Sequence, residues 1–104
     1  MTTLEPFEAD GQAFTGNVQL VHAVGMHARP AVKLTKLAKK FQAQVHVRVA
    51  GAGEWINAKS VAKIMAMRAA HGSIIEIRAS GRDAQSAVAA LVDLIAADFP
   101  DGTA

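Results

Sequence analysis

A histidine and an arginine two positions apart stand just before a proline in the segment Gly25–Pro30, which reads GMHARP. Proline is tolerated in the first turn of a helix, because the amide that it lacks would have no partner inside the helix there. The spacing therefore predicts that a helix begins near Ala28 or Arg29 and that His27 lies at its N-terminus. Unpaired amides and the positive end of the helix dipole make such a position a binding site for an anion.

The chemistry that these residue types favour is the transfer of a phosphoryl group. A neutral imidazole is nucleophilic near neutral pH, and a phosphoryl group on its ring would carry roughly two negative charges. The backbone amides of Ala28 and Arg29 can receive that charge, and the Arg29 guanidinium offers a fork of donors that suits phosphate oxygens. Gly25 permits a positive φ, which would let the His27 ring point outward. The alternative is that His27 is an ordinary polar residue at the surface or at a helix cap.

The length and composition of the chain limit what it can be. Its 104 residues suit one domain with its own hydrophobic core. The absence of cysteine excludes disulfides, thiolate catalysis and cysteine-based metal sites, and agrees with a reducing cytosol. No apolar run is as long as a membrane span, and residues 1–11 lack the features of a signal peptide. We expect a cytoplasmic protein without direct membrane insertion, in which residues 1–13 form a flexible tail and residues 14–104 form the domain.

Hydrophobic periodicity predicts a series of strands and helices after the tail. Alternating apolar and polar residues predict strands, and apolar residues spaced three and four apart predict helices with one buried face. Asp83 should cap the start of the last helix, and Pro100 and Gly102 should end it. The predicted strands are residues 14–20, 44–49, 54–57 and 75–79, and the predicted helices are residues 28–41, 61–67 and 84–99.

The order of these elements is strand, helix, strand, strand, helix, strand, helix. Strands with one polar face favour a mainly antiparallel sheet that helices cover on one side only. The sequence thus predicts an α+β sandwich of βαββαβα order, and the periodicity leaves the order of the strands in the sheet open. Trp55, the only tryptophan, should cover the outer surface of the sheet or of a loop.

Positive charge is concentrated in the two central helical segments, although the net charge of the chain is only +2. The lysines there lie mostly off the buried stripe and should face solvent. Such a basic face speeds encounters with acidic partners, and it can also serve a nucleic-acid-binding module, which is one alternative function. Against that alternative, the one aromatic residue near the face, Phe41, belongs to the buried stripe, and no recognised binding motif is present. The basic residues are Arg29, Lys33, Lys36, Lys39, Lys40, Lys59, Lys63 and Arg68.

The remaining histidines give no sign of a metal site. His22 falls at a strand end, His46 on the outer face of a strand and His71 in a loop, without the spacing of metal ligands. The sequence also lacks a G-x-x-x-x-G-K-[ST] loop, a G-x-S-x-G turn and a carboxylate pair placed as acid and base. Self-contained catalysis, a metal ion and a cofactor are therefore not expected.

Two further features of the sequence stand in register. They are Gly25–Ala31 followed by Leu34, Leu37, Ala38 and Phe41, and Asn57–Val61 followed by Gly72. Together these motifs resemble the HPr family, the histidine-containing phosphocarriers of the bacterial phosphoenolpyruvate-dependent phosphotransferase system. The similarity extends over about residues 14–99, and it implies an open-faced sandwich in which three helices cover one face of a four-stranded, mainly antiparallel sheet.

The resemblance implies that His27 takes a phosphoryl group on its δ nitrogen from enzyme I and passes it to a histidine of a IIA-type protein or domain. Arg29 and the helix amides would hold the phosphate in both complexes. In this role the protein is a monomeric, stoichiometric carrier without cofactors, and neither an independent enzyme nor a nucleic-acid-binding protein. Regulatory-branch, nitrogen-type carriers of the family also contain GMHARP, so control of partner proteins through the phosphorylation state is the alternative. The pathway beyond the acceptor, such as sugar uptake, dihydroxyacetone phosphorylation or nitrogen and carbon regulation, stays open.

The second motif implies a regulatory site and a docking surface beside His27. Ser60 should cap the helix that follows it through its hydroxyl. In some bacteria the matching serine is phosphorylated by HPr kinase/phosphorylase, and added charge there would repel an acidic partner without unfolding the helix. The expected partner surface combines basic and apolar side chains, since methionine suits a surface that serves more than one partner. It consists of Lys36, Lys39, Val61, Ala62, Lys63 and Met65.

Overall fold

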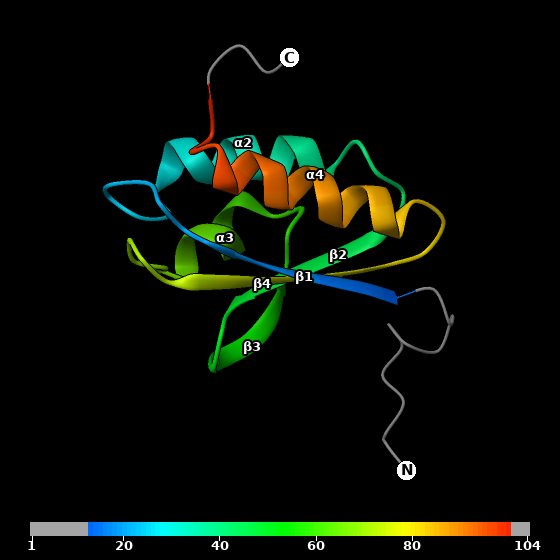
Figure 1. Cartoon of the computed structure of the whole chain (residues 1–104), viewed down its shortest axis with the longest axis horizontal. Coiled ribbons are helices and arrows are strands. Elements are labelled where there is room, and N and C mark those ends of the chain that lie inside the picture. The colour runs from blue at the N-terminus through cyan, green and yellow to red at the C-terminus, as the bar shows by residue number, and fades with distance from the viewer. Residues whose placement is uncertain (1–12, 101–104) are drawn as a thin grey trace.

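The computed structural model describes residues 13–100, and within them four strands and three helices follow the predicted βαββαβα order (Figure 1). The predicted tail, residues 1–13, lies outside this part of the chain except for Ala13, which begins the first strand. No helix in residues 13–100 has the length and apolar character that crossing a bilayer requires. The elements are β1 (Ala13–Gln19), α2 (Ala28–Ala38), β2 (Gln44–Val49), β3 (Ala52–Asn57), α3 (Val61–Ala66), β4 (Ile74–Ser80) and α4 (Ala84–Ala96).

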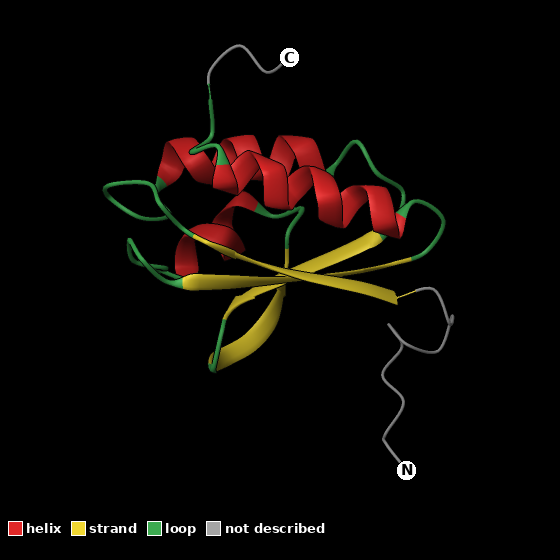
Figure 2. Ribbon diagram, in the orientation of Figure 1, coloured by secondary structure: helices red, strands yellow, loops and turns green. Residues whose placement is uncertain are grey.

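The four described strands form one antiparallel sheet in the order β1-β4-β2-β3. β4 lies at its centre and pairs with β1 from Ala13↔Ser80 to Gln19↔Ile74. All three described helices lie on one side of the sheet, and the other side is open (Figure 2). The predicted open-faced α+β sandwich is therefore confirmed, and the strand order is new information from the structure.

The hydrophobic core lies between the sheet and the helices. Alternate strand residues such as Val47 and Ile77 are fully buried, as are helix residues such as Leu34 and Leu91. Burying one such side chain contributes roughly 1.5–3 kcal/mol. Gly16 lets α4 approach β1 closely, because a Cβ at that position would lie 2.8 Å from Cγ1 of Val88. The spacing that predicted one buried face for each helix is thus confirmed.

The last helix ends earlier than predicted. α4 stops at Ala96, and Phe99 is buried but lies beyond the helix in a reversing turn. The amide of Phe99 donates to the carbonyl of Leu94, and the amide of Asp98 donates to the carbonyl of Ile95, which is the pattern of a Schellman motif. Asp98 takes the left-handed position with φ of 63°, which aspartate tolerates better than most residues. Of the two residues that should end the helix, Gly102 lies outside the described residues.

The first long helix also ends early. α2 stops at Ala38 with Lys39 as its C-cap, so Phe41 packs against the core from the following loop and not from the helix. The prediction of a helix over 28–41 was therefore wrong at its C-terminal end, although Phe41 is half-buried as its place in the apolar stripe indicated.

Two helix caps were predicted, and one of them is confirmed. Oγ of Ser60 accepts a hydrogen bond from the amide of Lys63 at 3.3 Å and so caps α3. Asp83 occupies the N-cap position of α4 but makes no side-chain cap bond. Its carboxylate instead accepts from the amides of Gln42 at 3.0 Å and Ala43 at 2.8 Å. These backbone hydrogen bonds hold the pKa of Asp83 below its ordinary value and tie the loop after α2 to the start of α4.

The open face of the sheet carries a small polar cluster around Trp55. The guanidinium carbons of Arg48 and Arg78 lie 4.5 Å and 4.4 Å from the centre of the Trp55 ring. Nε of Arg48 also donates to Oε1 of Glu76 at 2.6 Å. Beside them, burial and then the charge of Arg78 lower the pKa of His46. Trp55 therefore covers the outer sheet surface, as predicted.

Candidate functional site

The turn before α2 is held against the loop that follows α3. Gly25 has φ of 78°, and a Cβ there would lie 2.5 Å from the carbonyl oxygen of Ala69. The amide of the next residue, Met26, donates to the same carbonyl oxygen at 2.9 Å, and its side chain is buried. Only glycine fits both the backbone angle and the close approach. This anchored turn determines where His27 stands.

His27 is the N-cap residue of α2, and its side chain is exposed. Its backbone is extended, with φ of −110° and ψ of −163°, and its carbonyl accepts the first helical bond from the amide of Ala31. The ring makes no cap bond to the helix amides. The imidazole therefore stands in solvent at the positive end of the helix dipole.

The first turn of α2 leaves backbone donors available. The amides of Ala28 and Arg29 have no hydrogen-bond partner among residues 13–100, and Pro30 has no amide to offer. Arg29 is exposed, and its guanidinium makes no ion pair in the described part of the chain. The structure thus places two free amides and one guanidinium next to His27 in sequence. No hydrogen bond or cation–π contact joins the Arg29 side chain to the His27 ring in the described part of the chain, so the phosphate-binding role of Arg29 stays a prediction.

A second histidine, His22, lies directly against His27. Nε2 of His22 is 3.2 Å from Nε2 of His27, and the ring centres are 5.1 Å apart. On its other side, Nδ1 of His22 is 2.7 Å from Oδ1 of Asp98. β1 ends at Gln19, so His22 lies in the following loop and not at the strand end that the sequence indicated. In the sequence, the only local indication that the two rings meet is that His22 and His27 stand five positions apart, on either side of the turn at Gly25.

The turn that ends α4 completes this corner of the molecule. The Phe99 ring packs edge-on against His22 with 6.0 Å between the ring centres. Nζ of Lys33, on α2, donates to the carbonyl oxygen of Phe99 at 2.8 Å. Lys33 is therefore half-buried and tethered, in contrast to the prediction that the α2 lysines face solvent. The hydrogen bond from Lys33 to the Phe99 carbonyl explains why this lysine does not extend into solvent. The same bond helps to hold the turn that contains Asp98.

The residues predicted to dock partners lie on α2 and α3, two helices that contact each other. Lys36 and Lys39 are exposed on α2. On α3, Ala62 and Met65 are exposed, and Met65 is 40% accessible. Of the other two members of this set, Lys63 is exposed and Val61 is partly buried against the core.

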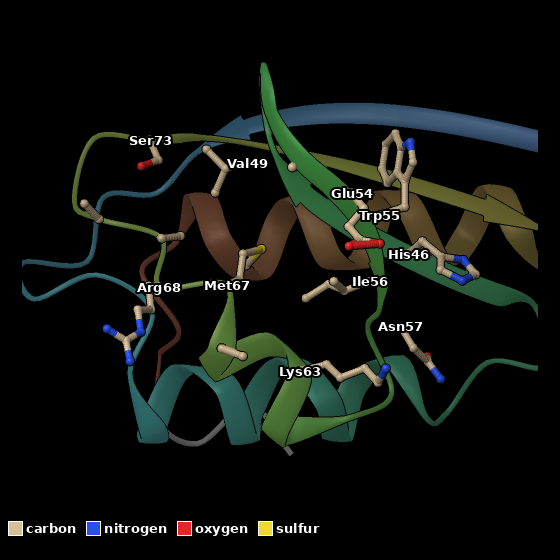
Figure 3. Close-up of a pocket in the computed structure, with 14 residues that line it drawn as sticks. His46, Val49, Glu54, Trp55, Ile56, Asn57, Lys63, Met67, Arg68 and Ser73 are labelled. Atoms are coloured by element: carbon tan, nitrogen blue, oxygen red, sulfur yellow. The ribbon is translucent and has the colours of Figure 1, made fainter.

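A groove of about 750 Å³ lies elsewhere, between β3 and α3. Figure 3 shows Ile56 and Met67 in the groove, with His46 and Asn57 toward one side and Arg68 pointing away from it. No residue of Gly25–Pro30 lines it, so it is separate from the candidate site. Residues 13–100 also hold no cluster of three or more histidine, cysteine or acidic side chains suited to a metal ion.

Comparisons with known proteins agree on one kind of relative. Residues 14–97 match the family model described as the PTS HPr component phosphorylation site. The chain is 37% identical over 83 residues to phosphocarrier protein HPr of Cupriavidus necator, covering 80% of this chain and 91% of that protein. It is 36% identical over 84 residues to phosphocarrier protein NPr of Escherichia coli K12, covering 81% and 92% of the two chains.

A longer relative and a solved structure extend the comparison. The chain is 35% identical over 92 residues to the multiphosphoryl transfer protein of Vibrio cholerae, and this match spans 88% of the chain but only 23% of that relative. The crystal structure of HPr from Thermoanaerobacter tengcongensis superposes with a TM-score of 0.76 and 34% identity, covering 83% of this chain and 94% of that one.

Proposed function

The chain belongs to the HPr family of phosphocarriers of the phosphotransferase system, and we propose that His27 is the residue that carries the phosphoryl group. The observation that supports this assignment is the exposed His27 imidazole beside the free amides of Ala28 and Arg29. A dianionic phosphoryl group on His27 would meet donors that nothing else in the described chain uses.

The proposed step is an in-line transfer between two histidines. A ring nitrogen of His27 attacks phosphorus, the new N–P bond forms, and the bond to the donor histidine breaks with its electron pair returning to the donor ring. Onward transfer is the same step in reverse with a new acceptor. Such a reaction needs positioning and charge compensation more than covalent help from the protein. We assign charge compensation to the Ala28 and Arg29 amides and to the Arg29 guanidinium.

The proposed donor is enzyme I, charged by phosphoenolpyruvate, and the proposed acceptor is a histidine of a IIA-type component. The exposed positive charge of Lys36, Lys39 and Lys63 would speed encounters with acidic partners. Ala62 and Met65 supply exposed apolar surface on the adjoining helix, as expected for a face that docks more than one protein.

A regulatory-branch carrier is the second candidate, and the similarity to phosphocarrier protein NPr supports it. In that case the phosphorylation state of His27 would control partner proteins. The test offers the phosphorylated protein to purified IIA-type domains of the sugar class and of the nitrogen class. Faster transfer to the nitrogen class would favour the regulatory branch, and faster transfer to the sugar class would favour the transport branch.

Ser60 is proposed as a regulatory phosphorylation site for a kinase of the HPr kinase/phosphorylase type. Its hydroxyl already accepts from the Lys63 amide at the start of α3, among the proposed docking residues. A phosphate there would place negative charge on a basic surface and weaken docking of an acidic partner.

The experiment that tests the carrier role is incubation with enzyme I and radiolabelled phosphoenolpyruvate. We expect acid-labile, alkali-stable label on the wild-type chain and none on His27→Ala. His71→Ala is the matched control, because His71 is also an exposed loop histidine and should leave labelling unchanged. A second arm with potassium phosphoramidate, a small chemical donor, separates a failure to dock enzyme I from a failure of the imidazole. Label retained by His27→Ala in the enzyme I arm would refute the assignment, and in the phosphoramidate arm label is counted only at position 27, because an exposed imidazole such as that of His71 can also react.

A further inference from the structure

We propose that His22, held by Asp98, is a positioning residue that keeps the proton of the His27 ring on Nε2 and so leaves Nδ1 as the nucleophile. This inference rests on the proposed function of His27. It assigns a role to two side chains, one from the loop after β1 and one from the turn after α4, that meet only in the folded chain.

The donors and acceptors along the chain of contacts determine the arrangement. A carboxylate only accepts, so Nδ1–H of His22 donates to Oδ1 of Asp98 across 2.7 Å. Nε2 of a neutral His22 then carries a lone pair, and it accepts Nε2–H of His27 across 3.2 Å. With its proton on Nε2, the His27 ring presents an unprotonated Nδ1. No hydrogen bond within residues 13–100 reaches that nitrogen.

His22 is held in this position from several sides. Its side chain is only 25% accessible, and the edge of the Phe99 ring packs against it. Asp98 sits at the left-handed position of the Schellman motif, so its backbone is fixed by two helix-end hydrogen bonds. The bond from Lys33 to the Phe99 carbonyl ties the same turn to α2. The position of the His22 ring is therefore fixed by the loop after β1, the turn after α4 and, through Lys33, by α2.

The pair of histidines has a specific task during transfer. As Nδ1 of His27 forms its bond to phosphorus, positive charge grows on the ring, and Nε2–H becomes a stronger donor. The hydrogen bond to His22 strengthens at that moment, and the Asp98 carboxylate offsets the charge. The proton stays on Nε2 of His27 throughout, and the electron pair of the broken P–N bond returns to the donor imidazole. Onward transfer reverses each change.

The same positions of the ring nitrogens are also compatible with a second arrangement of protons, and the test must distinguish the two arrangements. If His22 were an imidazolium that donated to both neighbours, the proton of His27 would lie on Nδ1 and block attack from that nitrogen. We expect ¹⁵N NMR of histidine-labelled protein, in mildly alkaline buffer with EDTA, to show His27 protonated on Nε2 and His22 protonated on Nδ1. A His27 ring protonated on Nδ1 would overturn the proposal. This measurement needs no phosphoryl donor, so it reads the tautomer even where the carrier assignment fails.

Two substitutions separate the acceptor role of His22 from simple packing. His22→Phe keeps a ring against Phe99 but has no acceptor, whereas His22→Gln lacks the ring and offers a carbonyl oxygen near the position of Nε2. We expect His22→Phe to slow phosphoryl uptake at His27 from phosphoramidate about tenfold and His22→Gln to restore most of that loss. In the NMR spectrum, His22→Phe should also shift His27 toward a mixture of tautomers. The opposite order of rates, with phenylalanine retaining activity and glutamine losing it, would show that His22 only packs.

Wild-type labelling decides which of the two proposals has failed. If His27 takes no label from either donor, the carrier assignment falls, whatever the tautomer. If His27 is labelled but neither His22 variant changes the rate or the tautomer, the carrier assignment stands and the positioning role of His22 is refuted.

Discussion

The helices α2 and α3 lie in contact and begin in opposite ways. At the start of α3, Oγ of Ser60 accepts the Lys63 amide and closes the helix end. At the start of α2, the N-cap is His27, whose ring contacts His22 and makes no cap bond, and the amides of Ala28 and Arg29 stay unpaired within residues 13–100. A cap of the α3 kind is worth about 1 kcal/mol of stability. The α2 start lacks that contribution and leaves its first amides free for the phosphoryl group that we propose His27 carries.

Copying the α3 cap onto α2 should give the largest effect. In His27→Ser the hydroxyl can accept from a first-turn amide, so we expect the free energy of unfolding to rise by about 1 kcal/mol. Phosphoryl uptake should disappear completely. Urea denaturation measures the first change, and labelling with enzyme I and phosphoenolpyruvate measures the second. A His27→Ser variant with a lower free energy of unfolding than wild type would contradict the expectation that the start of α2 lacks a stabilising cap.

The next effect concerns the charge at the open helix end. Arg29→Ala removes the guanidinium without touching the core, so the fold should be intact and phosphoryl transfer about tenfold slower, as for the loss of one charge-assisted hydrogen bond. Rapid-quench kinetics with enzyme I measures the rate, and Lys40→Ala, at an exposed position just beyond the other end of α2, is the matched control. Equal rates in wild type and Arg29→Ala would remove Arg29 from the site.

Removing the α3 cap should lower the stability of the fold and leave phosphoryl uptake unchanged, which is the reverse of the result expected for His27→Ser. Ser60→Ala loses the bond to the Lys63 amide, and we expect the free energy of unfolding to fall by about 1 kcal/mol or less, since that bond is long at 3.3 Å. Uptake of label at His27 should be unchanged. Parallel denaturation and labelling experiments check the two halves of this prediction. A large loss of uptake would mean that the start of α3 contributes to the transfer step.

The smallest effect is expected at the start of α4 and depends on pH. Because backbone amides hold the folded-state pKa of Asp83 below its ordinary value of 3.8, its ionised carboxylate stabilises the fold above that pH. This contribution is lost as the pH falls through the lowered pKa. Asp83→Asn should therefore be less stable than wild type near neutral pH, and the difference should shrink in acid. Denaturation across a pH series checks this, with the exposed Asp93→Asn as control. A gap that stayed constant with pH would contradict the role of the charge.

Features that depend on neighbouring residues were predictable from the sequence, and features that depend on distant partners were not. The GMHARP turn, the alternation in each strand and the Ser60 cap are local patterns, and the structure has all three. Asp83 has the residue type of a cap, but the amides of Gln42 and Ala43 compete for its carboxylate from about forty positions away. The His22–Asp98 bond joins residues 76 positions apart, so no local pattern could indicate it. The strand order likewise follows from pairing between remote segments.

The single carbonyl oxygen of Ala69 has a mechanical consequence. It accepts a hydrogen bond from the Met26 amide and leaves no room for a side chain at position 25. The turn that bears His27 is therefore fixed in position against the segment after α3. A partner that docked on the outer face of α3, as we propose, would therefore meet the His27 imidazole at a fixed distance. On the proposed function, the phosphoryl donor and the acceptor would each find His27 in the same position without a rearrangement of the carrier.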